Sequence, residues 1–189
     1  MKPLLIAAVV SITCGLALAG RADGRLSAAA DPDDPFAQGN WTFQTYGSVV
    51  VGDDDKGELY SVHSGFGYFF LDDVSVNLEG VGGYVDAARD DDGGFGGLDL
   101  YFAWHLLRGE NWSLFISGGA GLQQASTNFP SDSHFNFRLQ TGLGATLQLT
   151  DTMSLIGGAR YIHISNAGIS EVNDGLDGAL LFTGLMVRF

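Results

Sequence analysis

The chain has 189 residues, of which 46% are hydrophobic and 28 are glycine, and it carries 22 acidic against 9 basic side chains. This length suits one domain, and the apolar content with only four prolines argues against disorder despite the net charge of −13. So acidic a chain argues against nucleic acid as a partner, because few scattered bases cannot neutralise phosphates. The single cysteine, Cys14, excludes a disulfide framework and a cysteine-based metal site.

The first residues have the pattern of an export signal. Lys2 precedes an apolar stretch over residues 4–18, and the small residues Ala17-Leu18-Ala19 fit a cleavage site. We therefore expect a signal peptide over residues 1–19. A lipid anchor on Cys14 is disfavoured, because the apolar stretch continues past the cysteine. After this segment no run approaches the roughly 18 apolar residues that a membrane helix needs.

Residues 20–39 are rich in Ala, Asp and Pro and predict an N-terminal linker, or a loosely held arm. From residue 40 to residue 189 apolar and polar residues alternate with period 2, and clusters of Asp, Asn and Gly interrupt the pattern. This pattern predicts eight strands, over residues 41–51, 58–70, 74–86, 95–107, 112–126, 135–149, 153–165 and 176–189. The predicted fold is therefore all-β.

The connections between these strands alternate in length. Three are tight turns, and the others are longer and polar, as at 53–57, 89–94 and 127–134. Tight turns on one side and long loops on the other are typical of an eight-stranded antiparallel transmembrane barrel of the outer membrane. Strands of about 11 to 15 residues also suit a tilted bilayer crossing better than the roughly 5 to 6 residues of a soluble sheet.

Each strand pairs an apolar face with a face that contains charge. In 176–189, Leu181 and Leu185 share one face, and Arg188 lies on the other. A soluble lipid-binding barrel would turn the apolar face inward. A small membrane barrel turns it towards lipid, and its interior is then filled by the charged and polar side chains Glu79, Asp99, His105, Arg138 and Arg160. Aromatic residues near the strand ends and a terminal Phe189 on the apolar face favour the membrane barrel.

Polar residues at the outer end of the last hairpin suggest a catalytic site. His163 and Ser165 are two apart on a strand, so their side chains point to the same face. Arg160 has the opposite parity and can hardly face hydrocarbon, which places His163 and Ser165 on the lipid side. Asp177 shares the parity of the outward-facing residues of its own strand.

A serine, a histidine and an aspartate that can reach one another are the residue types that catalyse acyl transfer. Ser165 would be the nucleophile, His163 the general base and then acid, and Asp177 the group that orients the imidazole. One hairpin register opposes His163 to Asp177, although the pattern leaves the register open. The loop that follows offers oxyanion donors in Asn166, Asn173 and the backbone near Gly168. The competing interpretation is an ordinary polar rim that happens to carry Ser, His and Asp.

The local sequence resembles a known family. The run Tyr161-Ile162-His163-Ile164-Ser165-Asn166-Ala167-Gly168, followed by Asn173-Asp174-Gly175 and Asp177, is similar to the active-site hairpin of the PagL-type lipid A 3-O-deacylases, also called acyloxyacyl hydrolase-like proteins. The resemblance implies an outer-membrane serine esterase that removes the 3-hydroxyacyl chain at position 3 of lipid A in lipopolysaccharide. It implies no cofactor and leaves a homodimer open.

By this resemblance His163 and Ser165 fall on the base and the nucleophile of the family. Asp177 falls where the family usually has Glu, which is one methylene longer, and so the hydrogen bond to His163 needs a closer backbone. Glu171 is a nearby alternative acid, although it lies in the middle of the loop. Asn173 and the backbone around Gly168 are the oxyanion candidates that the resemblance favours.

Other polar features have simpler interpretations. His63 and Ser64 are adjacent and point to opposite faces, so they cannot form a catalytic pair. No two histidines have the spacing of metal ligands, and the sequence therefore predicts no metal site. The acidic loops at 53–55 and 90–92 would repel lipid A phosphates unless divalent cations bridge them, and solvated loop tips are the plainer interpretation.

Two functions from different classes remain at this point. The first is a lipid A deacylase in the outer membrane. The second is a non-catalytic barrel with a structural or adhesive role, in which the residues of the hairpin are idle. A soluble periplasmic lipid-binding barrel is a third and weaker alternative.

Overall fold

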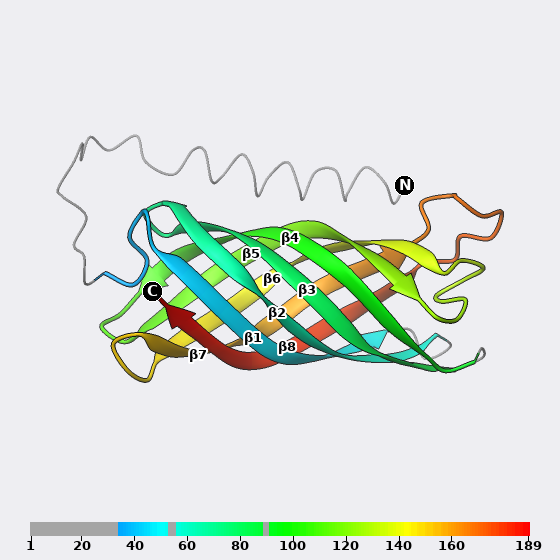
Figure 1. Cartoon of the computed structure of the whole chain (residues 1–189), viewed down its shortest axis with the longest axis horizontal. Helices are drawn as coiled ribbons and strands as arrows, with labels where there is room; N and C mark the ends of the chain where they lie inside the picture. Colours follow the sequence, from blue (N-terminus) through cyan, green and yellow to red (C-terminus); the bar gives the residue numbers. More distant parts are fainter. Residues whose placement is uncertain (1–33, 53–55, 89–90) are drawn as a thin grey trace.

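The computed structural model describes residues 34–52, 56–88 and 91–189, and the predicted signal peptide lies outside the described residues. The strands form a closed antiparallel barrel in which each strand pairs with the next and β8 pairs with β1 (Figure 1). This confirms the predicted fold class. The strands are β1 (Trp41–Gly52), β2 (Gly57–Leu71), β3 (Val74–Ala87), β4 (Gly93–Arg108), β5 (Trp112–Ala125), β6 (Phe135–Gln148), β7 (Met153–Ser165) and β8 (Leu176–Arg188).

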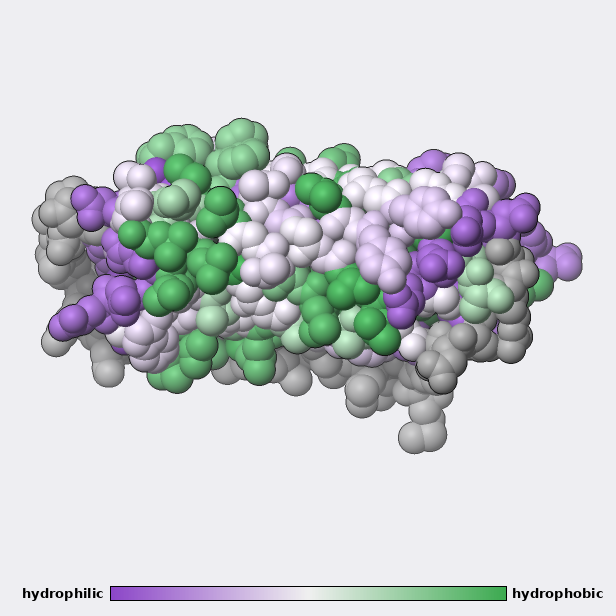
Figure 2. Space-filling view, turned by 90° about the horizontal axis from the view of Figure 1, so that it is seen from below, coloured by the Kyte–Doolittle hydropathy of each residue, from purple (hydrophilic) through white to green (hydrophobic). Residues whose placement is uncertain are grey.

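The outer wall of the barrel is apolar, because alternate residues of each strand point outward. Along β3 to β5 the exposed residues include Leu78, Leu98, Leu100 and Leu122. Figure 2 shows apolar and weakly polar residues over the middle of one face and hydrophilic residues towards the two ends. The described residues contain no helix that is long and apolar enough to cross a membrane.

The interior of the barrel is closely filled by a polar and charged network together with an apolar cluster that includes Ile162, Ile164 and Leu180. Glu79 accepts hydrogen bonds from the hydroxyls of Tyr46, at 2.5 Å, and Tyr101, at 2.7 Å. Arg138 forms an ion pair with Asp99, with 3.1 Å between Nε and Oδ1. All five polar residues that the sequence assigns to the interior are buried, namely Glu79, Asp99, His105, Arg138 and Arg160.

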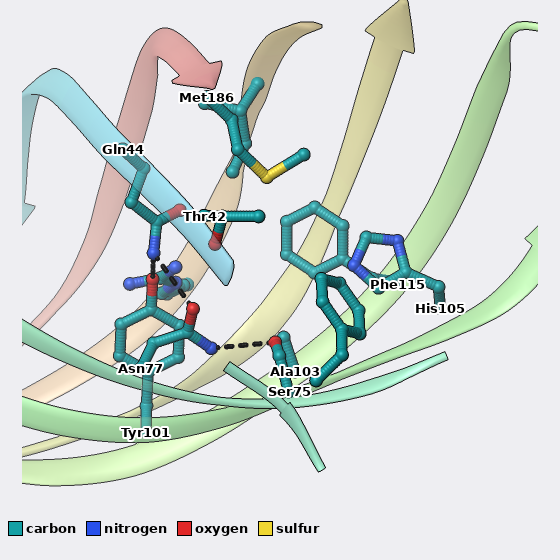
Figure 3. A pocket seen from close by; sticks show the side chains of 12 residues that line it. Thr42, Gln44, Ser75, Asn77, Tyr101, Ala103, His105, Phe115 and Met186 are labelled. Carbon is teal, nitrogen blue, oxygen red and sulfur yellow. Dashed lines mark hydrogen bonds between the residues drawn. The ribbon is translucent and has the colours of Figure 1, made fainter. Parts of the chain in front are cut away.

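A small cavity lies inside the barrel, between polar residues such as Gln44 and Asn77 and the rings of Tyr101, His105 and Phe115 (Figure 3). Its volume of about 10 Å³ is close to what a single water molecule needs. An acyl chain does not fit there, so this cavity does not support the soluble lipid-binding alternative.

The chain leading into β1 is packed against the barrel at the end with the tight turns. Phe36 is buried against Phe69 and Met186, and the guanidinium of Arg108 lies 4.8 Å from the centre of the Phe36 ring. Arg108 also forms an ion pair with Asp34. Residues 34–39 are therefore fixed, which corrects the expectation of a loosely held arm for this part of the predicted linker.

Both ends of the described chain lie at the same end of the barrel. In Figure 1 the start of the described chain and the C-terminus are beside each other, and the β7–β8 loop extends from the opposite end. An even number of antiparallel strands requires this arrangement. The hairpin with the candidate site thus reaches the end with the long loops.

Candidate active site

The candidate site lies on the outer wall, where β7 ends. Tyr161, His163 and Ser165 alternate with the fully buried residues Ile162 and Ile164, which anchor the strand to the interior. The inward apolar side chains therefore hold the polar ones outward in a fixed orientation. This is the facing that parity predicts.

Strand pairing brings the acid to the histidine. In the register of β7 and β8, His163 lies directly opposite Asp177, and Ile164 lies opposite Leu176. Opposed residues in an antiparallel pair have Cβ atoms only about 4.5 to 5.5 Å apart. The short side chain of an aspartate can therefore reach the imidazole without any displacement of the backbone.

The three side chains form a continuous hydrogen-bonded row. His163 Nδ1 donates to Asp177 Oδ1 at 2.6 Å, and Ser165 Oγ lies 3.0 Å from His163 Nε2. With the proton on Nδ1, Nε2 carries a lone pair and accepts from the serine hydroxyl. The side chains of His163 and Asp177 are 22% and 36% exposed, so the row is open to a substrate on the outer wall. Such an arrangement can activate a serine for attack on an ester.

The loop after Ser165 is braced by Asn166, which is fully buried. Its side-chain amide donates to Ser170 Oγ and to the Val172 carbonyl, both at 2.8 Å, and its Oδ1 accepts from the Gly168 amide. The side-chain donors of Asn166 and the amide of Gly168 are thus used within the loop. Neither group is left to bind an oxyanion in this conformation.

Asn173 is placed differently. Its Oδ1 accepts a hydrogen bond from the Asn166 backbone amide at 3.1 Å, and the residue is otherwise exposed on the loop. This contact fixes the amide group by its oxygen and leaves its nitrogen as a donor. Of the three residues proposed from the sequence as oxyanion donors, Asn173 is the one whose side chain contributes only its oxygen to the hydrogen bonds described for this loop.

Glu171, the alternative acid, is exposed in the middle of the loop. Asp177 occupies the place beside His163 that an orienting acid needs. The geometry therefore favours Asp177 over Glu171.

Sequence reasoning missed one contact at this site. The hydroxyl of Tyr161 donates to Asp177 Oδ1 at 2.5 Å, the same oxygen that accepts from His163. Parity places Tyr161 on the face of His163 and Ser165, so the proximity could have been found. Its position near a strand end suggested only an aromatic residue of the membrane interface.

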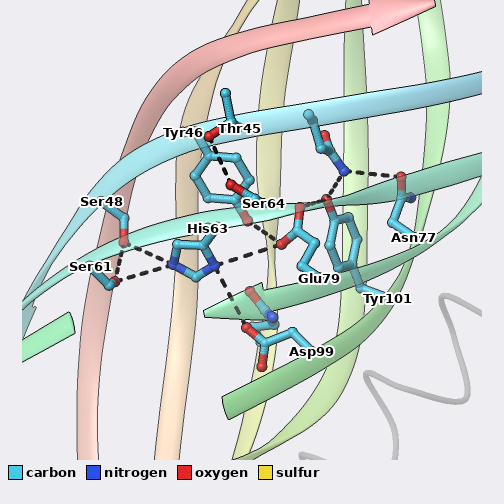
Figure 4. A network of polar contacts seen from close by, with 12 residues as sticks. Thr45, Tyr46, Ser48, Ser61, His63, Ser64, Asn77, Glu79, Asp99 and Tyr101 are labelled. Atoms are coloured by element: carbon cyan, nitrogen blue, oxygen red, sulfur yellow. Dashed lines mark hydrogen bonds and ion pairs between the residues drawn. The ribbon is translucent and has the colours of Figure 1, made fainter. Parts of the chain in front are cut away.

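A second polar cluster lies inside the barrel, away from this site (Figure 4). Ligand atoms of His63, Glu79 and Asp99 lie within 4.8 Å of one another, and all three residues are buried. Histidine spacing could not reveal this group, because its members come from β2, β3 and β4. The two carboxylate charges are matched by the buried guanidiniums of Arg138 and Arg160, so the cluster is part of the ionic filling of the barrel.

Solved structures share the fold of this chain. The outer membrane enzyme PagL superposes with a TM-score of 0.63 and 19% identity, covering 76% of this chain and 98% of that one. Neisserial surface protein A has a TM-score of 0.59 and 15% identity, covering 79% and 96%. The N-terminal barrel domain of Pseudomonas aeruginosa OprF has a TM-score of 0.52 and 20% identity, covering 80% and 98%. At these identities the likeness concerns the fold. No curated protein sequence matches this chain.

The model of one protein family matches residues 65–186, which is more than half of the chain. The match contains β3 to β7 entirely, together with His163, Ser165 and Asp177. The apolar outer wall, the buried charged residues and this family match confirm that the protein is located in the outer membrane. The family is described as lipid A 3-O-deacylase, and the chain belongs to this PagL family.

Proposed function

We propose that the protein is a serine esterase that removes the ester-linked 3-hydroxyacyl chain at position 3 of lipid A, with His163, Ser165 and Asp177 as its catalytic residues. The observation that carries the proposal is the position of His163, which is hydrogen-bonded to Ser165 on one side and to Asp177 on the other. Membership of the lipid A 3-O-deacylase family supports the choice of substrate.

The reaction divides into acylation and deacylation. Ser165 Oγ attacks the ester carbonyl carbon while His163 Nε2 takes the hydroxyl proton, and Asp177 stabilises the imidazolium that forms. The tetrahedral intermediate collapses, the bond to the sugar oxygen breaks, and His163 returns the proton to that oxygen. Water then attacks the acyl-enzyme with His163 as base. The products are the 3-hydroxy fatty acid and lipid A with a free hydroxyl at position 3.

An oxyanion donor has to face the carbonyl oxygen during both steps. Asn173 suits this role, because its Oδ1 is held by the Asn166 amide and its side-chain nitrogen is left to donate. Donors that are fixed before the reaction stabilise the developing charge without reorganisation. No metal or other cofactor is required by this mechanism.

The outward placement of the site suits a lipid substrate. Leu139 lies opposite His163, and Phe137 lies opposite Ser165, so the neighbouring wall of β6 offers apolar contacts to acyl chains. A lipid that is already anchored in the outer leaflet can reach Ser165 by lateral diffusion. It does not have to enter the barrel, whose interior is filled.

The proposal is tested by mass spectrometry of lipid A after incubation with detergent-refolded protein. Wild type is expected to remove one 3-hydroxyacyl chain, and Ser165→Ala is expected to remove none. Ser64→Ala is the matched control, since Ser64 is an exposed serine on the outer wall that is hydrogen-bonded to Thr45. If folded wild-type protein left lipid A unchanged, this result would favour the non-catalytic barrel.

A further inference from the structure

We infer that Tyr161 is a positioning residue of the catalytic site, which holds the carboxylate of Asp177 against His163. This inference rests on the proposed function. It starts from the shared acceptor: Asp177 Oδ1 receives hydrogen bonds from the Tyr161 hydroxyl, at 2.5 Å, and from His163 Nδ1, at 2.6 Å. The length of the tyrosine contact is in the short range that is typical of a hydroxyl donating to an ionised carboxylate.

The position of Asp177 explains why a second donor is needed. Its side chain is 36% exposed on the outer wall, so solvent can compete for its oxygens. The hydrogen bond from His163 is one contact to a carboxylate whose side chain rotates about two bonds. The Tyr161 hydroxyl approaches the same oxygen from further down β7 and restricts this rotation.

Strand geometry makes Tyr161 suited to this role. It lies two residues before His163 on the same face of β7, and it pairs with Ala179, two residues after Asp177 on β8. The small side chain of Ala179 leaves the diagonal from Tyr161 to Asp177 open. A tyrosine spans the roughly 7 to 8 Å of such a diagonal pair, whereas a shorter polar side chain would not.

The consequence concerns the direction of the imidazole. While Oδ1 stays opposite Nδ1, the Nδ1 proton remains engaged and Nε2 keeps its lone pair towards Ser165. When the carboxylate turns away, the ring can rotate or change tautomer, and the serine loses its base. Tyr161 thus acts through Asp177, and it need not touch the substrate.

An alternative role for Tyr161 is that of an aromatic anchor at the membrane interface. The chain offers a matched comparison for this alternative, because Tyr84 on β3 is also 48% exposed and also donates to an aspartate, Asp92, at 2.9 Å. Tyr84→Phe and Tyr161→Phe remove the same atom from similar surroundings. Only the second touches the proposed catalytic row.

The kinetic test measures kcat and KM for lipid A in mixed micelles. We expect Tyr161→Phe to lower kcat by about tenfold with KM unchanged, as the loss of one hydrogen bond to a charged group implies, and Tyr84→Phe to leave both values unchanged. Full activity of Tyr161→Phe would overturn the inference. A raised KM with unchanged kcat would also overturn it, because it would indicate direct contact with the substrate.

A second measurement does not depend on activity. In histidine-labelled protein in micelles, the Nδ1 proton of His163 should give a downfield NMR resonance that is absent in Asp177→Asn. In Tyr161→Phe this proton should exchange with water several times faster than in wild type, and in Tyr84→Phe at the wild-type rate. Unchanged exchange in Tyr161→Phe would contradict the inference. If the wild type is inactive but shows the expected exchange, the proposed function fails while the positioning role stands.

Discussion

In the proposed catalytic row, the role of each side chain depends on the side chains hydrogen-bonded to it. His163 is useful as a base because Asp177 accepts from Nδ1, and Ser165 is useful as a nucleophile because Nε2 is then free to accept its proton. Parity and motif predict these residues from the sequence. They cannot predict that two donors converge on one carboxylate oxygen, because that depends on side-chain rotamers and on the register of β7 and β8.

The choice of the acid is tested at this scale. We expect Asp177→Asn to lower the deacylation rate by at least about 10²-fold, because an amide favours the wrong imidazole tautomer. Glu171→Gln should change the rate by less than about threefold, since Glu171 is exposed in the loop. Initial rates of fatty acid release measure both variants. The opposite order of the two effects would identify Glu171 as the acid.

At the scale of the element, the hairpin of β7 and β8 holds the site in place by close backbone contact. A Cβ atom on Gly175 would lie 2.8 Å from His163 Cε1, 2.9 Å from the Ile164 carbonyl oxygen and 3.2 Å from Ser165 Cβ. The lack of a side chain at this position leaves the space that the imidazole occupies. The sequence shows the glycine within Asn173-Asp174-Gly175, but only the paired strands show what it makes room for.

Gly175→Ala is therefore expected to fold and to lose activity. The added methyl group displaces the His163 ring, and a misplacement of about 1 Å can lower a catalytic rate by about 10²-fold. Gly80→Ala is the control, because the nearest atom to its added Cβ would be 3.8 Å away. The rates of fatty acid release by the two variants are compared after gel electrophoresis of heated and unheated samples has shown that both barrels are folded. A rate near that of wild type in Gly175→Ala would contradict this prediction, because it would show that the His163 ring accommodates the added methyl group.

The strands themselves were predictable to within two residues at every boundary. Their signal is strong because each strand separates lipid from a polar interior, so period 2 persists over the whole length of the strand. Residues 34–39 were harder to predict. Their fixed position depends on the burial of Phe36 against Phe69 and Met186, which come from β2 and β8, and composition alone cannot show such a contact.

At the scale of the whole molecule, the barrel combines an apolar outer wall with an interior in which paired charges lie beside buried apolar side chains. Parity predicted which charges lie inside, since Glu79, Asp99, Arg138 and Arg160 are all buried. It could not predict their partners, because these come from other strands. Asp99 on β4 pairs with Arg138 on β6, and β5 lies between them in the barrel.

This pairing makes the stability of the barrel depend on both members of an ion pair. Asp99→Asn removes the carboxylate charge beside the buried guanidinium of Arg138, whose hydrogen-bond acceptor Gln123, at 3.1 Å, is neutral. We expect this variant to lower the free energy of unfolding by about 3 to 5 kcal/mol. The double variant Asp99→Asn with Arg138→Met removes the unpaired charge and should recover most of this loss. Asp92→Asn, in an exposed loop, should change stability by less than about 0.5 kcal/mol. Reversible urea unfolding in lipid vesicles measures all three. If the double variant were as unstable as Asp99→Asn alone, removing the unpaired charge would not have raised the free energy of unfolding. The loss of stability in Asp99→Asn would then come from lost packing.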